Sequence, residues 1–209
     1  MGKIKAVLFD MDGVLIDAKD WHYEALNKAL GLFGMEISRY DHLTTFDGLP
    51  TKVKLQMFSK RFFLPESLHS FINEVKQSYT AELIHEKCHP MFHHEYALSM
   101  LHQKGYKIAV CSNSIRKTIE LMMDKAELTP YLDLIVSNED VVKSKPDPEM
   151  YTTTINKFGL RPEECIVVED NPNGIQAGKA SGAHVLEVAT VYDVTFANIM
   201  RLVKECEDD

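Results

Sequence analysis

Five short apolar runs, rich in β-branched residues, constrain the fold of this chain more than any other feature. Near-continuous hydrophobicity without polar alternation is typical of strands that are buried on both faces of a parallel sheet. Between the later runs, apolar residues recur at helical spacing over residues 114–126 and 149–158. Strands that alternate with helices of crossover length predict an α/β fold with a doubly wound, mainly parallel sheet. The runs cover residues 4–9, 106–111, 134–137, 165–168 and 184–188.

One long segment interrupts this alternation. From about residue 17 to residue 88 the sequence shows no strand pattern, and helical patterns cover 21–33, 51–63 and 67–87 instead. Turn-forming residues at 47–50 and 63–65 separate these helices. A helical block inserted after the first strand predicts a separate all-helical cap domain. We therefore expect a catalytic core made of residues 1–16 and 89–209, and a cap made of residues 17–88.

Charge and hydropathy exclude several classes of partner. The 209 residues carry a formal net charge of −8, whereas binding to a nucleic-acid backbone needs a basic face. No apolar run approaches the roughly 20 residues of a membrane span. The four cysteines are far apart and show no metal-binding spacing, which is typical of reduced thiols. We expect a soluble, cytoplasmic protein, a monomer or weak dimer, with neither a nucleic-acid nor a membrane partner.

The first apolar run ends in two acidic residues, Asp10 and Asp12, followed by Gly13. In an open parallel sheet, ligands bind beyond the carboxyl ends of the strands, and glycine lets the backbone turn sharply there. Paired acids suit a hard divalent cation, or a nucleophile beside a general acid/base. The same pair also occurs in ordinary loops and helix starts, so it does not identify a site by itself.

Three further strand ends carry polar residues of matching chemistry. Ser112 and Ser114 lead into a helix, where hydroxyl and N–H groups bind anions or simply cap the helix. Lys145 precedes a proline, which favours an extended backbone at the lysine. A lysine fixed in this way can neutralise a phosphate, and the alternative is an ordinary loop lysine that faces solvent. Glu169 and Asp170 are adjacent acids that repel each other unless a cation lies between them. Because all four signals fall at one end of one sheet, they favour a common site.

These four segments together resemble the motifs of the haloacid dehalogenase superfamily. The matching segments are FDMDGVLID at residues 9–17, CSNS at 111–114, SKPDPEMY at 144–151 and VEDNPNGIQAG at 168–178. The resemblance extends over nearly the whole chain, including the helical block, and is closest to the β-phosphoglucomutase-like and sugar-phosphatase branch. It implies a Rossmann-like core with an inserted helical cap.

The resemblance also implies a role for each motif residue. Asp10 is the nucleophile that becomes an aspartyl phosphate, and Asp12 is the general acid/base. Ser112 and Lys145 hold the transferring phosphate, with help from the backbone N–H of Asn113. The expected cofactor is Mg²⁺, held by the Asp10 carboxylate, the Asp12 backbone carbonyl and Asp170, with Glu169 nearby.

Dehalogenases and phosphonate-cleaving relatives do not keep an aspartate at the position of Asp12, because they need no proton for an alcohol leaving group. The resemblance therefore implies that this chain acts on phosphate monoesters. The expected activity is therefore a Mg²⁺-dependent phosphatase that acts on a small phosphorylated metabolite, preferably a sugar phosphate. A sugar-phosphate mutase is the alternative, although Thr51 stands about where mutases of this branch tend to have an arginine. A third hypothesis is a signalling receiver module, which also forms a phosphoaspartate, but such a module is shorter and has no inserted cap.

Overall fold

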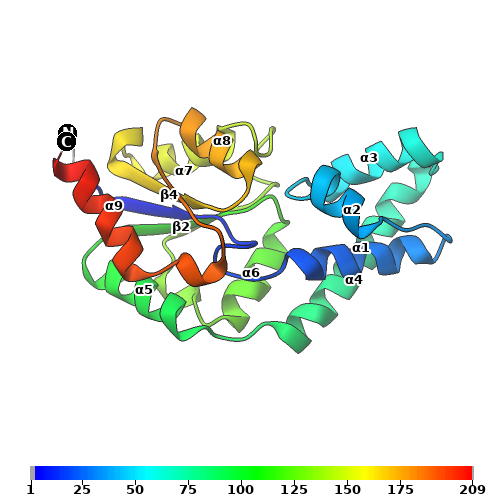
Figure 1. The fold of residues 1–209 in the computed structure, drawn as a ribbon, viewed down its shortest axis with the longest axis horizontal. Coiled ribbons are helices and arrows are strands. Elements are labelled where there is room, and N and C mark those ends of the chain that lie inside the picture. Colours follow the sequence, from blue (N-terminus) through cyan, green and yellow to red (C-terminus); the bar gives the residue numbers. More distant parts are fainter. Residues whose placement is uncertain (1–2, 209) are drawn as a thin grey trace. The chain divides into compact units, whose positions relative to one another are not determined.

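The computed structural model describes residues 3–208. Within this range, five strands form one parallel sheet (Figure 1). The strands lie in the order β3-β2-β1-β4-β5. All five predicted strands are present, and the predicted α/β fold class is confirmed. Residues 1, 2 and 209, which the predicted core includes, lie outside the described residues. The strands are β1 (Ala6–Phe9), β2 (Lys107–Cys111), β3 (Leu134–Val136), β4 (Cys165–Glu169) and β5 (His184–Glu187).

The sheet brings the carboxyl ends of its central strands level with one another. Strand β1 is the middle strand, and Phe9 lies opposite Val110 of β2 and Val168 of β4. All four residues of β1 and all five of β4 are buried, as the continuous apolar runs predict. Because the strands are parallel and in register, the residues that follow Phe9, Val110 and Val168 lie at the same edge of the sheet.

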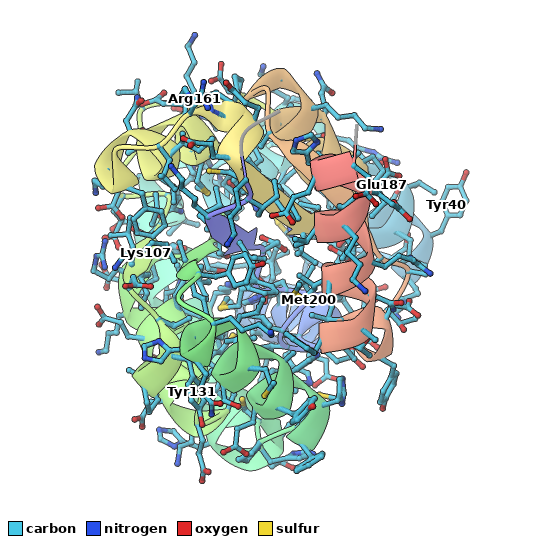
Figure 2. The ribbon with its side chains drawn as sticks, turned by 90° about the vertical axis from the view of Figure 1, so that its left-hand side faces the viewer. Tyr40, Lys107, Tyr131, Arg161, Glu187 and Met200 are labelled. Atoms are coloured by element: carbon cyan, nitrogen blue, oxygen red, sulfur yellow. The ribbon has the colours of Figure 1, made fainter. Side chains whose placement is uncertain are left out.

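Helices cover both faces of this sheet. In Figure 1, α7 and α8 lie on one side of the strands, and α5 and α9 lie on the other. In Figure 2, Arg161, which follows α7, and Tyr131, which follows α6, lie on opposite sides of Lys107 at the start of β2. Helix α7 has the bounds that the periodicity predicts. These helices are α5 (Phe92–Gln103), α6 (Arg116–Lys125), α7 (Glu149–Phe158), α8 (Pro172–Ala180) and α9 (Phe196–Asp208).

The chain divides into two compact units. The sheet and its helices form one, from the described residues up to Asp17 together with those from His89 onward, and Ala18–Cys88 forms the other. The second unit is entirely helical among the elements described and has its own apolar core, in which Leu30, Phe46 and Ile72 are buried. None of the described helices combines the length and the apolar content needed to cross a membrane.

The helical unit contains one feature that the sequence pattern did not predict. The predicted helices correspond to α1 (Lys19–Gly31), α3 (Thr51–Phe62) and α4 (His69–Lys87), the last preceded by the short turn η2 (Glu66–Leu68). Between α1 and α3, the chain also forms the short helix α2 (Arg39–Asp41), which continues into the π-helix η1 (His42–Phe46). The Ser38 hydroxyl accepts a hydrogen bond from the Asp41 N–H and so starts this turn. Segments this short carry too few apolar repeats to show a helical period.

Candidate active site

Lys145 lies at the centre of the polar residues that follow the strands. Its side chain is 4% exposed, and its ammonium group donates to three acceptors. These are Asp10 Oδ1 at 2.7 Å, Glu169 Oε1 at 2.6 Å and the Cys111 carbonyl oxygen at 2.8 Å. A lysine ammonium has three protons, so these bonds use all of its donors. The contacts join residues at the ends of β1, β2 and β4 to the loop that follows β3.

Asp10, Lys145 and Glu169 are all buried, so each charge among them needs an opposite charge nearby. Asp10 is 8% exposed and Glu169 is 1% exposed, so two carboxyl groups share one buried cation. Burial and the nearby Glu169 raise the pKa of Asp10 well above its ordinary value, and Lys145 opposes this shift. Burial alone would lower the pKa of Lys145, but the two carboxylates raise it above its ordinary value. Lys145 therefore stays charged and is the cation that allows Asp10 to ionise.

Asn113 holds the backbone of Lys145 with its side chain. Its Oδ1 accepts from the Lys145 N–H at 3.2 Å, and its Nδ2 donates to the Lys145 carbonyl at 3.4 Å. Asn138 donates in turn to the Asn113 carbonyl at 2.9 Å. The resemblance implied a role only for the backbone N–H of Asn113, which helps to hold the transferring phosphate. This side-chain contact was not predicted, because a motif names the residue but not the groups that it contacts.

Ser112 and Asp12 lie beside this cluster. Ser112 is 1% exposed, and its Oγ accepts a hydrogen bond from the Ser114 N–H at 3.1 Å. The hydroxyl therefore caps the turn, and as an acceptor it keeps its own proton to donate. The Ser114 hydroxyl donates to Asp12 Oδ2 at 3.3 Å. Asp12 is followed by Gly13, whose φ of 91° lies in the left-handed region that favours glycine.

Three of the predicted metal ligands lie together. Asp10, Glu169 and Asp170 each offer one carboxylate oxygen, and these oxygens lie within 4.8 Å of one another. An all-oxygen set with several negative charges fits a hard cation such as Mg²⁺. The Asp12 carboxylate is outside this group. The resemblance assigns Asp12 to the metal through its backbone carbonyl, and that role stays a prediction.

The structure adds two residues to the site that the sequence did not single out. The Tyr151 hydroxyl donates to Glu169 Oε1 at 2.6 Å, and burial together with Glu169 raises the pKa of Tyr151 well above its ordinary value. At Gly174 in α8, an added Cβ would overlap the Glu169 carboxylate. Tyr151 could have been found from the sequence, because it is an aromatic residue with a polar hydroxyl on the buried face of a helix. Both positions lie inside the matching motifs.

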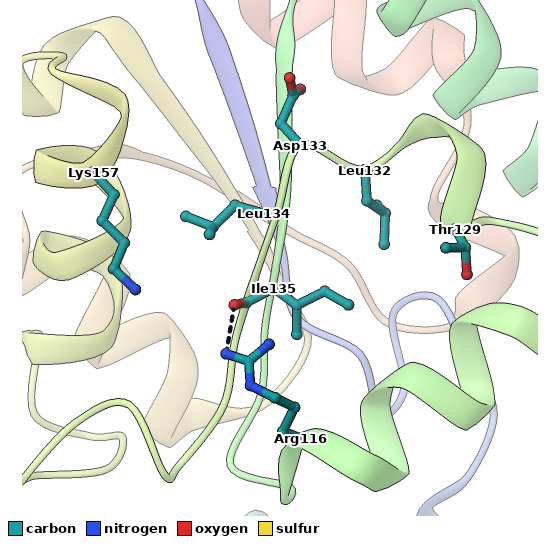
Figure 3. A pocket seen from close by; sticks show the side chains of 7 residues that line it. All are labelled: Arg116, Thr129, Leu132, Asp133, Leu134, Ile135 and Lys157. Carbon is teal, nitrogen blue, oxygen red and sulfur yellow. Dashed lines mark hydrogen bonds between the residues drawn. The ribbon is translucent and has the colours of Figure 1, made fainter.

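A shallow pocket at the edge strand β3 has different chemistry. Its volume is about 290 Å³, and Figure 3 shows Arg116 and Lys157 with Leu134 and Ile135 of the strand. Arg116 donates to the Ile135 carbonyl at 3.1 Å and so covers part of the open strand edge. None of the candidate catalytic or metal-binding residues lines this pocket.

Comparisons with known proteins agree with this arrangement. The model of the haloacid dehalogenase-like hydrolase family matches residues 7–188. A phosphoglycolate phosphatase of Aquifex aeolicus is 31% identical over 179 residues, which cover 86% of this chain and 82% of that protein. A phosphorylated carbohydrates phosphatase of Thermotoga maritima is 28% identical over 182 residues, with the same 86% and 82% coverage.

A solved structure shows the same fold. The β-phosphoglucomutase of Clostridium difficile superposes with a TM-score of 0.85 over 99% of this chain and 100% of that chain. The two sequences are 22% identical, so this similarity concerns the fold. Together with the family match and the phosphatase relatives, it confirms the resemblance that the four motifs indicated.

Proposed function

Because the chain belongs to the haloacid dehalogenase-like hydrolase family, we propose that it is a Mg²⁺-dependent phosphatase that forms an aspartyl phosphate on Asp10. It is an enzyme of the phosphoric monoester hydrolase type found in this family, which includes phosphatases and mutases. The proposed substrate is a small phosphate monoester, preferably a sugar phosphate. One observation carries the proposal. A buried lysine is bonded to Asp10 and Glu169, and these two carboxylates lie together with Asp170, so that the three could hold one cation.

In the first step, a carboxylate oxygen of Asp10 attacks the phosphorus atom of the ester. A bond forms between Asp10 and phosphorus, the ester P–O bond breaks, and Asp12 donates its proton to the leaving alcohol oxygen. Lys145 and Ser112 hold the phosphate oxygens in place, which is most of what phosphoryl transfer requires. Lys145 donates to Asp10 in the structure, so binding of the phosphate requires it to share or exchange one of its three hydrogen bonds.

In the second step, Asp12 accepts a proton from a water molecule, and the water oxygen attacks the phosphorus atom. The bond between Asp10 and phosphorus breaks, which releases inorganic phosphate and restores both aspartates. When held by Asp10, Glu169 and Asp170, with the Asp12 carbonyl, Mg²⁺ supplies positive charge that offsets the repulsion between carboxylate and phosphate. The Ser114 hydroxyl orients Asp12 through its hydrogen bond to Oδ2.

Hydrolysis is favoured over the mutase alternative on two grounds. The relatives from Aquifex aeolicus and Thermotoga maritima are both named as phosphatases. Thr51 also stands at about the place where mutases of the branch tend to carry an arginine, and Lys52 and Lys54 follow it. The assignment of residues 17–88 as a substrate-reading cap stays a prediction, as do a cytoplasmic location, the monomer or weak dimer, and the absence of nucleic-acid and membrane partners.

The proposal is tested by inorganic phosphate release from sugar phosphates and p-nitrophenyl phosphate, with Mg²⁺ and with EDTA. We expect Mg²⁺-dependent release that Asp10→Asn reduces at least about 10³-fold, because the variant lacks the nucleophilic oxygen. Asp124→Asn, the same change at an exposed position, is the matched control. Turnover by Asp10→Asn above a few per cent of the wild-type rate would refute the assignment of Asp10 as the nucleophile. If no ester releases phosphate but a sugar phosphate isomerises with added bisphosphate, the mutase is correct.

A further inference from the structure

We propose that Tyr151 is a positioning residue, which fixes the Glu169 carboxylate so that this carboxylate anchors the Lys145 ammonium. The inference rests on the proposed function for its effect on turnover, but its contacts are independent of the substrate. Tyr151 lies in the first turn of α7 and is fully buried. It is therefore held by the rigid core, which is where a residue that positions others is most effective.

Tyr151 contacts both members of the buried ion pair. Its hydroxyl donates to Glu169 Oε1 at 2.6 Å, and Lys145 Nζ donates to the same oxygen at 2.6 Å. Lys145 Nζ also lies 4.8 Å from the centre of the Tyr151 ring, within the range of a cation–π contact. One side chain thus holds the carboxylate with its polar tip and faces the ammonium with its ring.

This arrangement assigns different tasks to the two oxygens of Glu169. Oε1 accepts two short hydrogen bonds, one from Tyr151 and one from Lys145. Oε2 accepts a hydrogen bond from the Asp170 N–H at 3.2 Å. Because two short hydrogen bonds already occupy Oε1 and only one longer bond reaches Oε2, Oε2 is the oxygen with more capacity for a cation. The Tyr151 hydroxyl therefore separates the lysine-binding oxygen from the metal-facing oxygen.

Gly174 closes the remaining side of the carboxylate. Helix α8 passes so near that a Cβ at position 174 would overlap Glu169. The carboxylate is thereby confined between Tyr151, Lys145, the Asp170 backbone and α8. Loss of the Tyr151 hydroxyl would leave one lone pair of Oε1 unfilled in a buried site, which favours rotation of the carboxylate towards another donor or the metal. Lys145 would then move relative to Asp10.

The alternative is that Tyr151 only fills space in the apolar core, where it lies with Met150 and Ile155. Phenylalanine has the same ring, so it would preserve this packing and remove only the hydroxyl. A pure packing role therefore predicts that Tyr151→Phe leaves the site unchanged. Tyr131→Phe is the matched control, since it also removes a tyrosine hydroxyl bonded to a glutamate, here Glu95 at 3.3 Å.

The experiment compares Tyr151→Phe and Tyr131→Phe in two measurements. With p-nitrophenyl phosphate, we expect Tyr151→Phe to lower kcat about 10- to 100-fold, the usual cost of losing the partner of a metal ligand, while KM changes less than about 3-fold. Calorimetric titration of Mg²⁺ without substrate should show affinity weakened by about 10-fold or more. Tyr131→Phe should match the wild type in both. If Tyr151→Phe also matches the wild type in kcat and Mg²⁺ affinity, the inference is wrong.

A double-mutant cycle with Glu169→Gln tests whether Tyr151 acts through Glu169. If it does, the loss of Mg²⁺ affinity caused by Tyr151→Phe should shrink to less than about 2-fold in the Glu169→Gln background. Full additivity of the two losses would contradict the mechanism. If the wild type hydrolyses no ester, the proposed function fails, but the Mg²⁺ titrations still decide the role of Tyr151.

Discussion

At the scale of single residues, the Lys145 ammonium donates to Asp10, Glu169 and the Cys111 carbonyl, all within 2.8 Å. Removal of this cation would leave the buried carboxyl groups of Asp10 and Glu169 without the positive charge that balances them. We expect Lys145→Met to lower the free energy of unfolding by about 3–5 kcal/mol, the usual cost of breaking a buried ion pair from one side. Urea denaturation at pH 7 without Mg²⁺ measures this, since a bound metal would replace part of the lost charge.

Lys143→Met is the matched control for this prediction. The Lys143 side chain is 70% exposed and lies two residues earlier in the same loop. Its loss should change the free energy of unfolding by less than about 0.5 kcal/mol. If the two variants are destabilised equally, the buried contacts of Lys145 do not contribute as described.

The contrast between Lys145 and Tyr151 shows how far single residues are predictable from sequence. Asp10, Lys145, Glu169 and Asp170 could be placed together, because each lies at or beyond the carboxyl end of a strand in a parallel sheet, and such ends meet at one edge. Tyr151 and the side-chain contacts of Asn113 were not predicted. Their roles depend on which atoms approach within about 3 Å, and neither periodicity nor motif spacing contains that information.

At the scale of elements, the loop after β3 is tied to the start of α6. Asp140 Oδ2 accepts hydrogen bonds from the Ser137 N–H at 2.8 Å, the Ser137 hydroxyl at 2.7 Å and Arg116 at 2.7 Å. The same loop carries Asn138, which bonds to the Asn113 carbonyl. Partial burial alone would raise the pKa of Asp140. The hydrogen bonds from Ser137 and the charge of Arg116 outweigh this effect and lower the pKa to about 2.

This loop should become less stable in acid. A carboxyl whose pKa is lower in the folded state stabilises the fold above its unfolded pKa of 3.8, and the effect is lost as pH falls through about 2. We expect Asp140→Asn to cost about 1–2 kcal/mol at pH 6, and to cost progressively less from pH 4 to pH 2. Urea denaturation across this range measures the difference between variant and wild type.

The control for the loop is Glu120→Gln, which removes a more exposed partner of the same arginine, at 3.7 Å. Exposed pairs contribute little, so the cost should stay below about 0.5 kcal/mol at every pH. A cost for Asp140→Asn that does not change with pH would contradict the assignment of the lowered pKa to this carboxyl.

The elements themselves differ in how well the sequence predicts them. The strands were predicted because their runs are nearly continuously apolar, and β1 and β4 are buried throughout. Helix α7 was predicted because its apolar residues recur at helical spacing. The π-helix η1 was not, because five residues that include Thr44 and Thr45 show no helical period. Polar caps and neighbouring packing determine such short segments, and these contacts are formed only in the folded unit.

At the scale of the whole molecule, two properties combine. The chain has a net charge of −8, and three acidic oxygens lie within 4.8 Å of one another at the carboxyl edge of the sheet. Any cation therefore weakens the general self-repulsion, whereas a cation bound at the acidic cluster should stabilise the fold far more. The two effects differ in their dependence on concentration and on single carboxylates, so an unfolding measurement separates them.

We expect Mg²⁺ to raise the free energy of unfolding by about 2.7 kcal/mol at a hundredfold excess over its dissociation constant, because the unfolded chain does not assemble the cluster. Thermal unfolding with Mg²⁺, with EDTA, and with NaCl at equal ionic strength measures this. NaCl should give only the small effect of screening, since it has no specific ligands to bind. Asp170→Asn should abolish the Mg²⁺ increment, because it replaces one of the three negatively charged carboxylates with a neutral amide. If NaCl reproduces the increment, or if Asp170→Asn retains it, the cation acts on the net charge of the molecule and the acidic cluster is not its site.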